Sequence, residues 1–119
     1  MKAAEASRCA GEQGKYWEMH DQLFPNYTAL DLGDLFRYSQ TLGLDLQKFQ
    51  QCLESGKYVN EIRKDILEGQ KSGVRGTPTF FIGISNQDAS KVEVLKVIRG
   101  AQPFTNFKET LDSLLASQK

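Results

Sequence analysis

The sequence predicts a mostly helical α/β fold in which several helices come first and a β-hairpin and one more helix follow. Three observations predict this order. Apolar residues recur at steps of three and four over residues 2–73, two β-prone runs joined by a turn-rich segment occupy residues 79–98, and an amphipathic stretch follows Pro103. The length of 119 residues suits a single domain, and the sequence has no internal repeat, low-complexity tract or linker.

The first two-thirds of the chain divides into predicted helices that are separated by turn and capping residues. These helices are expected over residues 2–13, 16–24, 32–42, 46–53 and 59 to about 72. Pro25 and Gly43 end the second and third helices. Asp45 is placed to cap the fourth helix, and Gly56 is placed to stop it.

The pattern changes in the last third of the chain. Residues 79–82 form a short β-prone run, residues 83–90 are expected to be a loop, and residues 92–98 form a second β-prone run. Together they predict an antiparallel hairpin. Pro103 can then open a last helix, whose apolar face falls on residues 104–115.

The balance of charges argues against a nucleic-acid binder, because 15 basic residues face 15 acidic ones. Basic residues gather within residues 61–75, but acidic residues alternate with them, which indicates a solvated helix face.

No apolar run approaches the roughly 20 residues of a membrane span. Residues 1–10 lack the apolar segment of a signal peptide. The chain as given is therefore expected to stay in the cytoplasm if it is the whole gene product.

The residues that most often bind metals or cofactors do not form a site in this sequence. Cys9 and Cys52 are too far apart for a Cys-x-x-Cys pair, and with His20 they show no metal-ligand spacing. The sequence therefore predicts no metal and no cofactor. His20 is expected to pack or to form a hydrogen bond. Three aromatic residues beside it are expected to belong to the core: Tyr16, Trp17 and Phe24.

Four segments together resemble the DsbA-like branch of the thioredoxin superfamily and cover nearly the whole chain. They are AAEASRCAGEQGKYWEMHDQLF at residues 3–24, LGLDLQKFQQCLESGKY at 42–58, GVRGTPTFFIG at 73–83 and IRGAQPFTNFKETLDSLL at 98–115. The third is the most specific, because Thr-Pro between a helix and an apolar strand resembles the cis-proline loop of the thioredoxin fold. The resemblance implies one domain with a partial thioredoxin-like fold. Its parts would be a helical insertion at residues 1–73 and a β-hairpin with a C-terminal helix at residues 74–119.

The resemblance also implies what this chain lacks. The family's fold begins with a strand, a Cys-x-x-Cys at the start of a helix and a second strand, and this sequence starts just after that second strand. Neither cysteine falls at the position of the family's nucleophile, so no catalytic residue is assigned. The implied function is a portion of a thiol-disulfide oxidoreductase that supplies the substrate loop and a helical cap but is not redox-active by itself. The alternative is a non-enzymatic binding or assembly module, and Met1 fits both a fragment and a truncated gene product.

By resemblance, Arg75, Gly76, Thr77 and Pro78 form the loop that faces the reactive disulfide in the complete fold. This loop offers backbone groups to an extended protein or peptide substrate. A cis Thr77–Pro78 bond is expected, since an X-Pro bond reaches the cis form far more easily than other peptide bonds. The alternative is an ordinary trans proline at the start of a strand.

Cys9 and Cys52 lie on the apolar stripes of two predicted helices and leave three interpretations open. They could be reactive thiols, buried free cysteines that act as small apolar residues, or a structural disulfide. We favour the disulfide. The family resemblance then suggests a periplasmic or other extracytoplasmic location, where such bonds persist.

The resemblance also leaves one edge of the predicted hairpin without a neighbour. In the complete fold, the strand at residues 79–83 would pair with the second hairpin strand on one side and with the family's first strand on the other. This chain lacks that first strand, and an exposed apolar edge favours pairing with another chain. A homodimer is therefore expected. The alternatives are a partner chain that supplies the missing strands and a local rearrangement that covers the edge with a helix.

Overall fold

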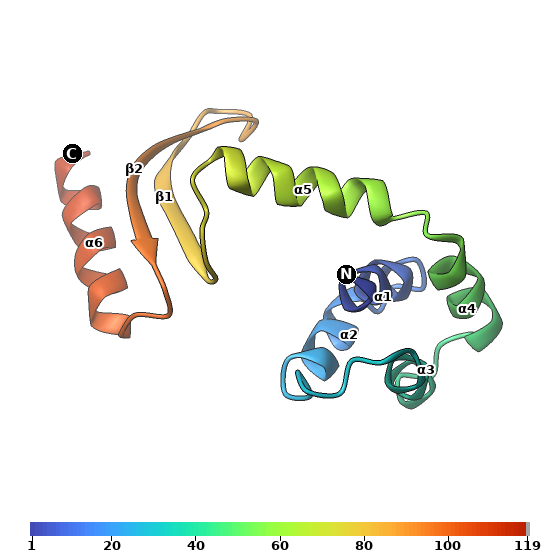
Figure 1. Cartoon of the computed structure of the whole chain (residues 1–119). Coiled ribbons are helices and arrows are strands. Elements are labelled where there is room, and N and C mark those ends of the chain that lie inside the picture. The colour runs from blue at the N-terminus through green and yellow to red at the C-terminus, as the bar shows by residue number, and fades with distance from the viewer. Residues whose placement is uncertain (119) are drawn as a thin grey trace. The chain divides into compact units, whose positions relative to one another are not determined.

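The computed structural model describes residues 1–118 (Figure 1). Its elements are α1 (Lys2–Gly11), α2 (Tyr16–Leu23), α3 (Leu32–Thr41), α4 (Leu46–Ser55), α5 (Val59–Lys71), β1 (Thr79–Ser85), β2 (Val92–Arg99) and α6 (Phe104–Ser117). This order confirms the predicted mostly helical α/β fold. The chain forms two compact units, a helical unit at Met1–Glu68 and a hairpin unit that begins at Gly69. The single domain with a division at residue 73 stays a prediction.

Local capping signals fix the ends of the helices in the helical unit. The Asp45 carboxylate accepts a hydrogen bond from the Lys48 backbone amide at 3.0 Å, which confirms the predicted cap of α4. Gly56 ends that helix with a φ of 65°, the left-handed conformation that glycine adopts most easily. At the start of α3, the Asp31 backbone amide donates to the Asp34 carboxylate at 3.2 Å. These contacts satisfy backbone groups that a helix end leaves unpaired.

The helical unit packs around one apolar core that α1 to α4 share. Its buried members are Ala6, Cys9, Ala10, Met19, Leu23, Leu35, Tyr38, Leu44, Phe49, Cys52 and Leu53. Phe49 is fully buried, and its ring meets the Phe36 ring edge-on with the centroids 6.0 Å apart. The Tyr38 hydroxyl donates to the Ala29 carbonyl at 2.8 Å, so its polar end is satisfied. The unit thus has a continuous core of its own.

Helix α2 faces this core with Met19 and Leu23 and turns a second apolar stripe outward. Tyr16, Trp17 and Phe24 are 38%, 66% and 69% exposed, so the prediction that they belong to the core is wrong. Both stripes have helical spacing. Spacing alone therefore cannot tell which of the two stripes is buried.

Strands β1 and β2 form an antiparallel pair that starts with Thr79 opposite Arg99. The register breaks between Ile82 and Gly83, where Leu95 is the extra residue of β2. This arrangement is a β-bulge, which inserts one unpaired residue into a ladder and increases the local twist. The predicted hairpin is therefore present, with an irregularity in its middle.

The first strand of the hairpin is longer than the sequence predicts. β1 continues to Ser85, so the loop expected over residues 83–90 is wrong for its first three residues. Gly83 is the first residue of that expected loop. In the structure it allows close strand approach, because a Cβ atom at this position would lie 1.9 Å from the Glu93 carbonyl oxygen.

The two faces of the hairpin differ in what covers them. α6 packs on one face, where the Phe80 and Phe107 rings meet edge-on with centroids 4.9 Å apart. On the other face, Phe81 is 41% exposed beside a cavity of about 550 Å³. Ser72 and the β2 residues Val92, Val94 and Val97 complete the lining of this cavity. The hairpin unit therefore keeps one apolar face open in the part of the chain that is described.

No helix within residues 1–118 combines the length and the apolar character that crossing a membrane requires.

Candidate functional site

Residues 75–78 form an exposed loop that connects α5 to β1. Both ends of the loop are held by hydrogen bonds within the hairpin unit. The Gly100 amide donates to the Pro78 carbonyl at 2.8 Å, and the Thr79 hydroxyl donates to the Gly76 carbonyl at 2.7 Å. The structure thus brings all four predicted substrate-loop residues together on one surface. Their contact with a substrate stays a prediction.

Thr77 occupies the centre of this loop, and its peptide bond to Pro78 is cis. Within residues 1–118, neither the backbone amide nor the carbonyl of Thr77 has a hydrogen-bond partner. Exposed backbone groups of this kind can pair with an extended peptide, as in strand addition. Thr77 therefore offers one donor and one acceptor to a ligand.

A cavity of about 260 Å³ lies beside the loop and adds residues that the sequence analysis missed. It is lined by residues 75–79 together with Arg99 and Gly100. Antiparallel pairing places Arg99 opposite Thr79, and the Arg99 guanidinium donates to the Gly73 carbonyl at 3.3 Å. The predicted hairpin could have indicated Arg99, because the last residue of the second strand of a hairpin lies opposite the first residue of its first strand.

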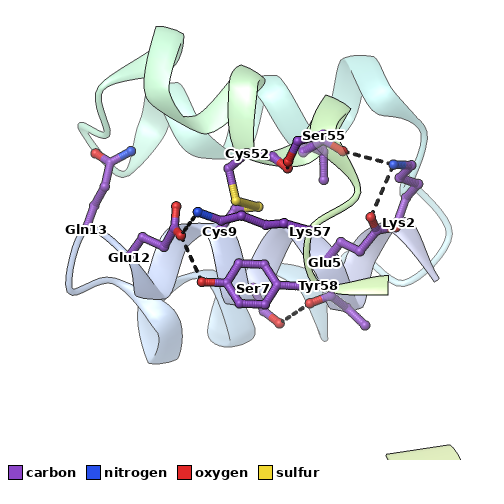
Figure 2. Close-up of a disulfide and its surroundings, with 12 residues drawn as sticks. Lys2, Glu5, Ser7, Cys9, Glu12, Gln13, Cys52, Ser55, Lys57 and Tyr58 are labelled. Atoms are coloured by element: carbon purple, nitrogen blue, oxygen red, sulfur yellow. Dashed lines mark hydrogen bonds and ion pairs between the residues drawn. A yellow bond between two sulfur atoms is a disulfide. The ribbon is translucent and has the colours of Figure 1, made fainter. Parts of the chain in front are cut away.

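The second predicted site is a disulfide that joins α1 to α4 through Cys9 and Cys52 (Figure 2). The two Cα atoms are 5.8 Å apart, and the cysteines are 1% and 6% exposed. These are the only cysteines of the sequence, so no free thiol is left. The bond lies in the core of the helical unit. Its burial shields both sulfur atoms from solvent.

A polar cluster of Glu12, Lys57 and Tyr58 lies beside the disulfide (Figure 2). Lys57 forms an ion pair with Glu12, and the Tyr58 hydroxyl donates to the same carboxylate at 2.9 Å. The hydrogen bond from Lys57 holds the pKa of Glu12 below its ordinary value. The bond to Glu12 raises the pKa values of both Lys57 and Tyr58, because the carboxylate favours their protonated forms. No spacing in the sequence indicated this cluster.

His20 packs and forms a hydrogen bond, as predicted. Its Nδ1 lies 3.1 Å from an Asp21 carboxylate oxygen. Its ring lies between the rings of Trp17 and Phe24, at centroid distances of 5.2 and 4.4 Å. In the part of the chain that the structure describes, no three or more His, Cys, Asp or Glu residues are grouped to hold a metal ion.

Comparison with known families gives one match that covers most of the chain. The family model described as a DSBA-like thioredoxin domain matches residues 1–112. This range includes both the disulfide and the loop at residues 75–78. No solved structure matches the chain.

Several curated proteins are similar to part of the chain. Na(+)/H(+) antiporter NhaA 3 of Salinispora tropica is 44% identical over 80 residues, which is 67% of this chain and 12% of that protein. Na(+)/H(+) antiporter NhaA 1 of Salinispora arenicola is 39% identical over 94 residues, or 78% of this chain and 14% of the relative. Na(+)/H(+) antiporter NhaA of Herminiimonas arsenicoxydans is 36% identical over 80 residues, which is 67% of this chain and 13% of that protein. The chain thus matches only 12% to 14% of the length of these relatives.

Proposed function

The chain belongs to the family of DSBA-like thioredoxin domains, and we propose that it supplies the substrate loop and helical cap of a thiol-disulfide oxidoreductase. The observation that supports this most strongly is Thr77, whose backbone amide and carbonyl are unpaired in an exposed loop. An extended protein or peptide substrate would pair with both groups. The loop would then hold the substrate while another segment exchanges the disulfide.

We propose further that the chain is not redox-active by itself. Disulfide exchange needs a thiolate that attacks and a second thiol that resolves the mixed disulfide. Cys9 and Cys52 are bonded to each other and buried in the helical unit. They do not flank the loop at residues 75–78 in sequence. The catalytic dithiol would therefore come from outside these 119 residues.

The names of the relatives state that they exchange Na(+) and H(+). This chain matches only 12% to 14% of the length of those proteins. We propose no part of that activity for this chain. The family match over residues 1–112 supports the peptide-binding proposal instead.

Titration of the ¹⁵N-labelled chain with an extended peptide should shift the amide resonances of Gly76, Thr77 and Thr79. The peptide carries an S-methylated cysteine, so that only non-covalent binding is measured. A matched peptide that is N-methylated at the residue opposite Thr77 should bind more weakly, because it cannot donate to the Thr77 carbonyl. In parallel, with dithiothreitol as the reductant, insulin should be reduced no faster in the presence of the chain than in buffer without it. Saturating peptide that leaves residues 75–79 unshifted, or turnover above the buffer rate, would contradict the proposal.

A second candidate function, an assembly module, is favoured by the free edge of β1. In the described part of the chain, β1 pairs only with β2. Its outer backbone groups are therefore open to another strand, and Phe81 and Ile84 are each 41% exposed. We propose that two copies of the chain pair through β1, or that a partner chain supplies the missing strand.

Light scattering at tens of micromolar should then show a species with twice the 13.4 kDa mass of one chain. Phe81→Lys should shift it to the monomer, because a charge beside an edge strand opposes pairing. Val94→Lys is the matched control, since Val94 is exposed on the same hairpin face but lies on β2. A monodisperse wild-type monomer would refute self-association.

A further inference from the structure

We infer that the loop at residues 75–78 selects acidic peptides, meaning extended segments with Asp or Glu near the residue that pairs with Thr77. This inference rests on the proposed peptide-binding function and names its substrate class. It comes from the charges around the cavity beside the loop. Two arginines, Arg75 and Arg99, line that cavity, and no carboxylate does.

Neither arginine is neutralised by a neighbouring side chain. Within residues 1–118, Arg75 and Arg99 take part in no ion pair. The Arg99 guanidinium donates one hydrogen bond to the Gly73 carbonyl, which positions it beside the loop. A guanidinium has five N–H donors, so most of those on Arg99 remain for a ligand.

The acidic residues described in the hairpin unit are placed or paired elsewhere. Asp88 and Glu93 belong to the turn end of the hairpin, and the seven residues of β1 put that end roughly 20 Å from the loop. This distance exceeds the screening length of about 8 Å at physiological salt. On α6, Asp112 forms an ion pair with Lys108 at 2.7 Å, and Glu109 lines a separate cavity. No acidic residue described in the hairpin unit therefore forms an ion pair with Arg75 or Arg99, and none lines the cavity beside the loop.

The spacing of the two arginines suits an extended ligand. Arg75 lies two residues before Thr77 in the loop, and Arg99 lies opposite Thr79 on β2. A peptide paired with the Thr77 backbone advances about 3.3 Å per residue, so side chains one or two positions away reach the guanidinium groups. A carboxylate there can bind the planar guanidinium fork in a bidentate manner.

A peptide explains the site better than a nucleic acid does. Thr77 offers a backbone donor and acceptor at the centre of the loop, which is the pairing that an extended peptide needs. The cavity of about 260 Å³ is lined by no aromatic side chain on which a base could stack. A short single-stranded DNA is therefore the competing ligand in the test.

The test uses three peptides that are identical except for Glu, Gln or Lys on both sides of one S-methylated cysteine. Binding is followed by the amide shifts of residues 75–79 in the full chain. At low salt the Glu peptide should bind about five times more tightly than the Gln peptide, which is the scale of two exposed ion pairs. The Lys peptide should bind least, and added salt should reduce the difference.

Arg75→Gln should halve the logarithm of the ratio between the affinities for the Glu and Gln peptides. Arg75→Lys should keep part of this preference. Lys91→Gln is the matched control, because it removes the same charge at the far end of the hairpin and should leave the preference unchanged. Arg99→Gln is interpreted only if its spectrum shows an intact hairpin, since Arg99 also contacts Gly73.

Equal binding of the Glu and Gln peptides at the loop would overturn the acidic selectivity and leave the proposed function standing. Binding of the DNA at the loop more tightly than the Glu peptide would also overturn it. If no peptide shifts residues 75–79, both the inference and the proposed function fail.

Discussion

Removing the Cys9–Cys52 disulfide should lower the free energy of unfolding of the helical unit by about 4 kcal/mol in the chain-entropy model. The two cysteines are 43 residues apart in sequence, so the bond greatly restricts the unfolded chain. The change is Cys9→Ala with Cys52→Ala. Urea unfolding is followed by the fluorescence of Trp17, which is the only tryptophan and lies in the helical unit.

The matched control for this double variant is the wild-type chain in dithiothreitol, which loses the bond but keeps both sulfur atoms in the core. Both samples should show similar losses of stability, because the missing crosslink dominates. A loss below about 0.5 kcal/mol in both samples would show that the bond contributes little, since surface substitutions usually change stability by no more than that.

Gly83→Ala should destabilise the hairpin by about 1 to 3 kcal/mol, the usual cost of forcing an extra group into a packed site. The new Cβ would lie 1.9 Å from the Glu93 carbonyl oxygen and 2.9 Å from a Val92 methyl carbon. The strands would have to separate at the bulge. Hydrogen exchange of the β1 and β2 amides should therefore become faster.

Gly76→Ala is the control for this variant, because a Cβ at position 76 would meet nothing within 4 Å. Both glycines lie in the hairpin unit and both are changed to alanine. The two variants therefore differ mainly in how crowded the space around the new Cβ atom is. Wild-type exchange rates in Gly83→Ala would contradict the close approach of the strands at this residue.

Much of the fold could be predicted because its boundaries depend on local chemistry. Asp45 and Gly56 delimit α4 through contacts that involve only near neighbours in sequence. Pro103 precedes α6 as predicted. Gly83 shows the limit of such signals, since a glycine favours a turn and a bulge equally well. Only the paired strand decides between the two.

The candidate site could be predicted less well, because its parts come from distant positions. The loop at residues 75–78 was found through family resemblance and not through spacing. Arg99 lies beside that loop only because the two strands pair. Arg75 and Arg99 are 24 positions apart in the sequence. The outward stripe of α2 was missed for a similar reason. Which face of a helix is buried depends on the neighbouring helices.

The disulfide also makes the segment from Cys9 to Cys52 a covalent ring that closes through sulfur. The exposed residues between α2 and α3, where Tyr27 is 74% exposed, lie inside this ring. Doubling the length of a closed loop adds only about 0.6 kcal/mol to its closure entropy. An insertion there would thus change stability little. A single proteolytic cut there would leave both pieces joined through the disulfide.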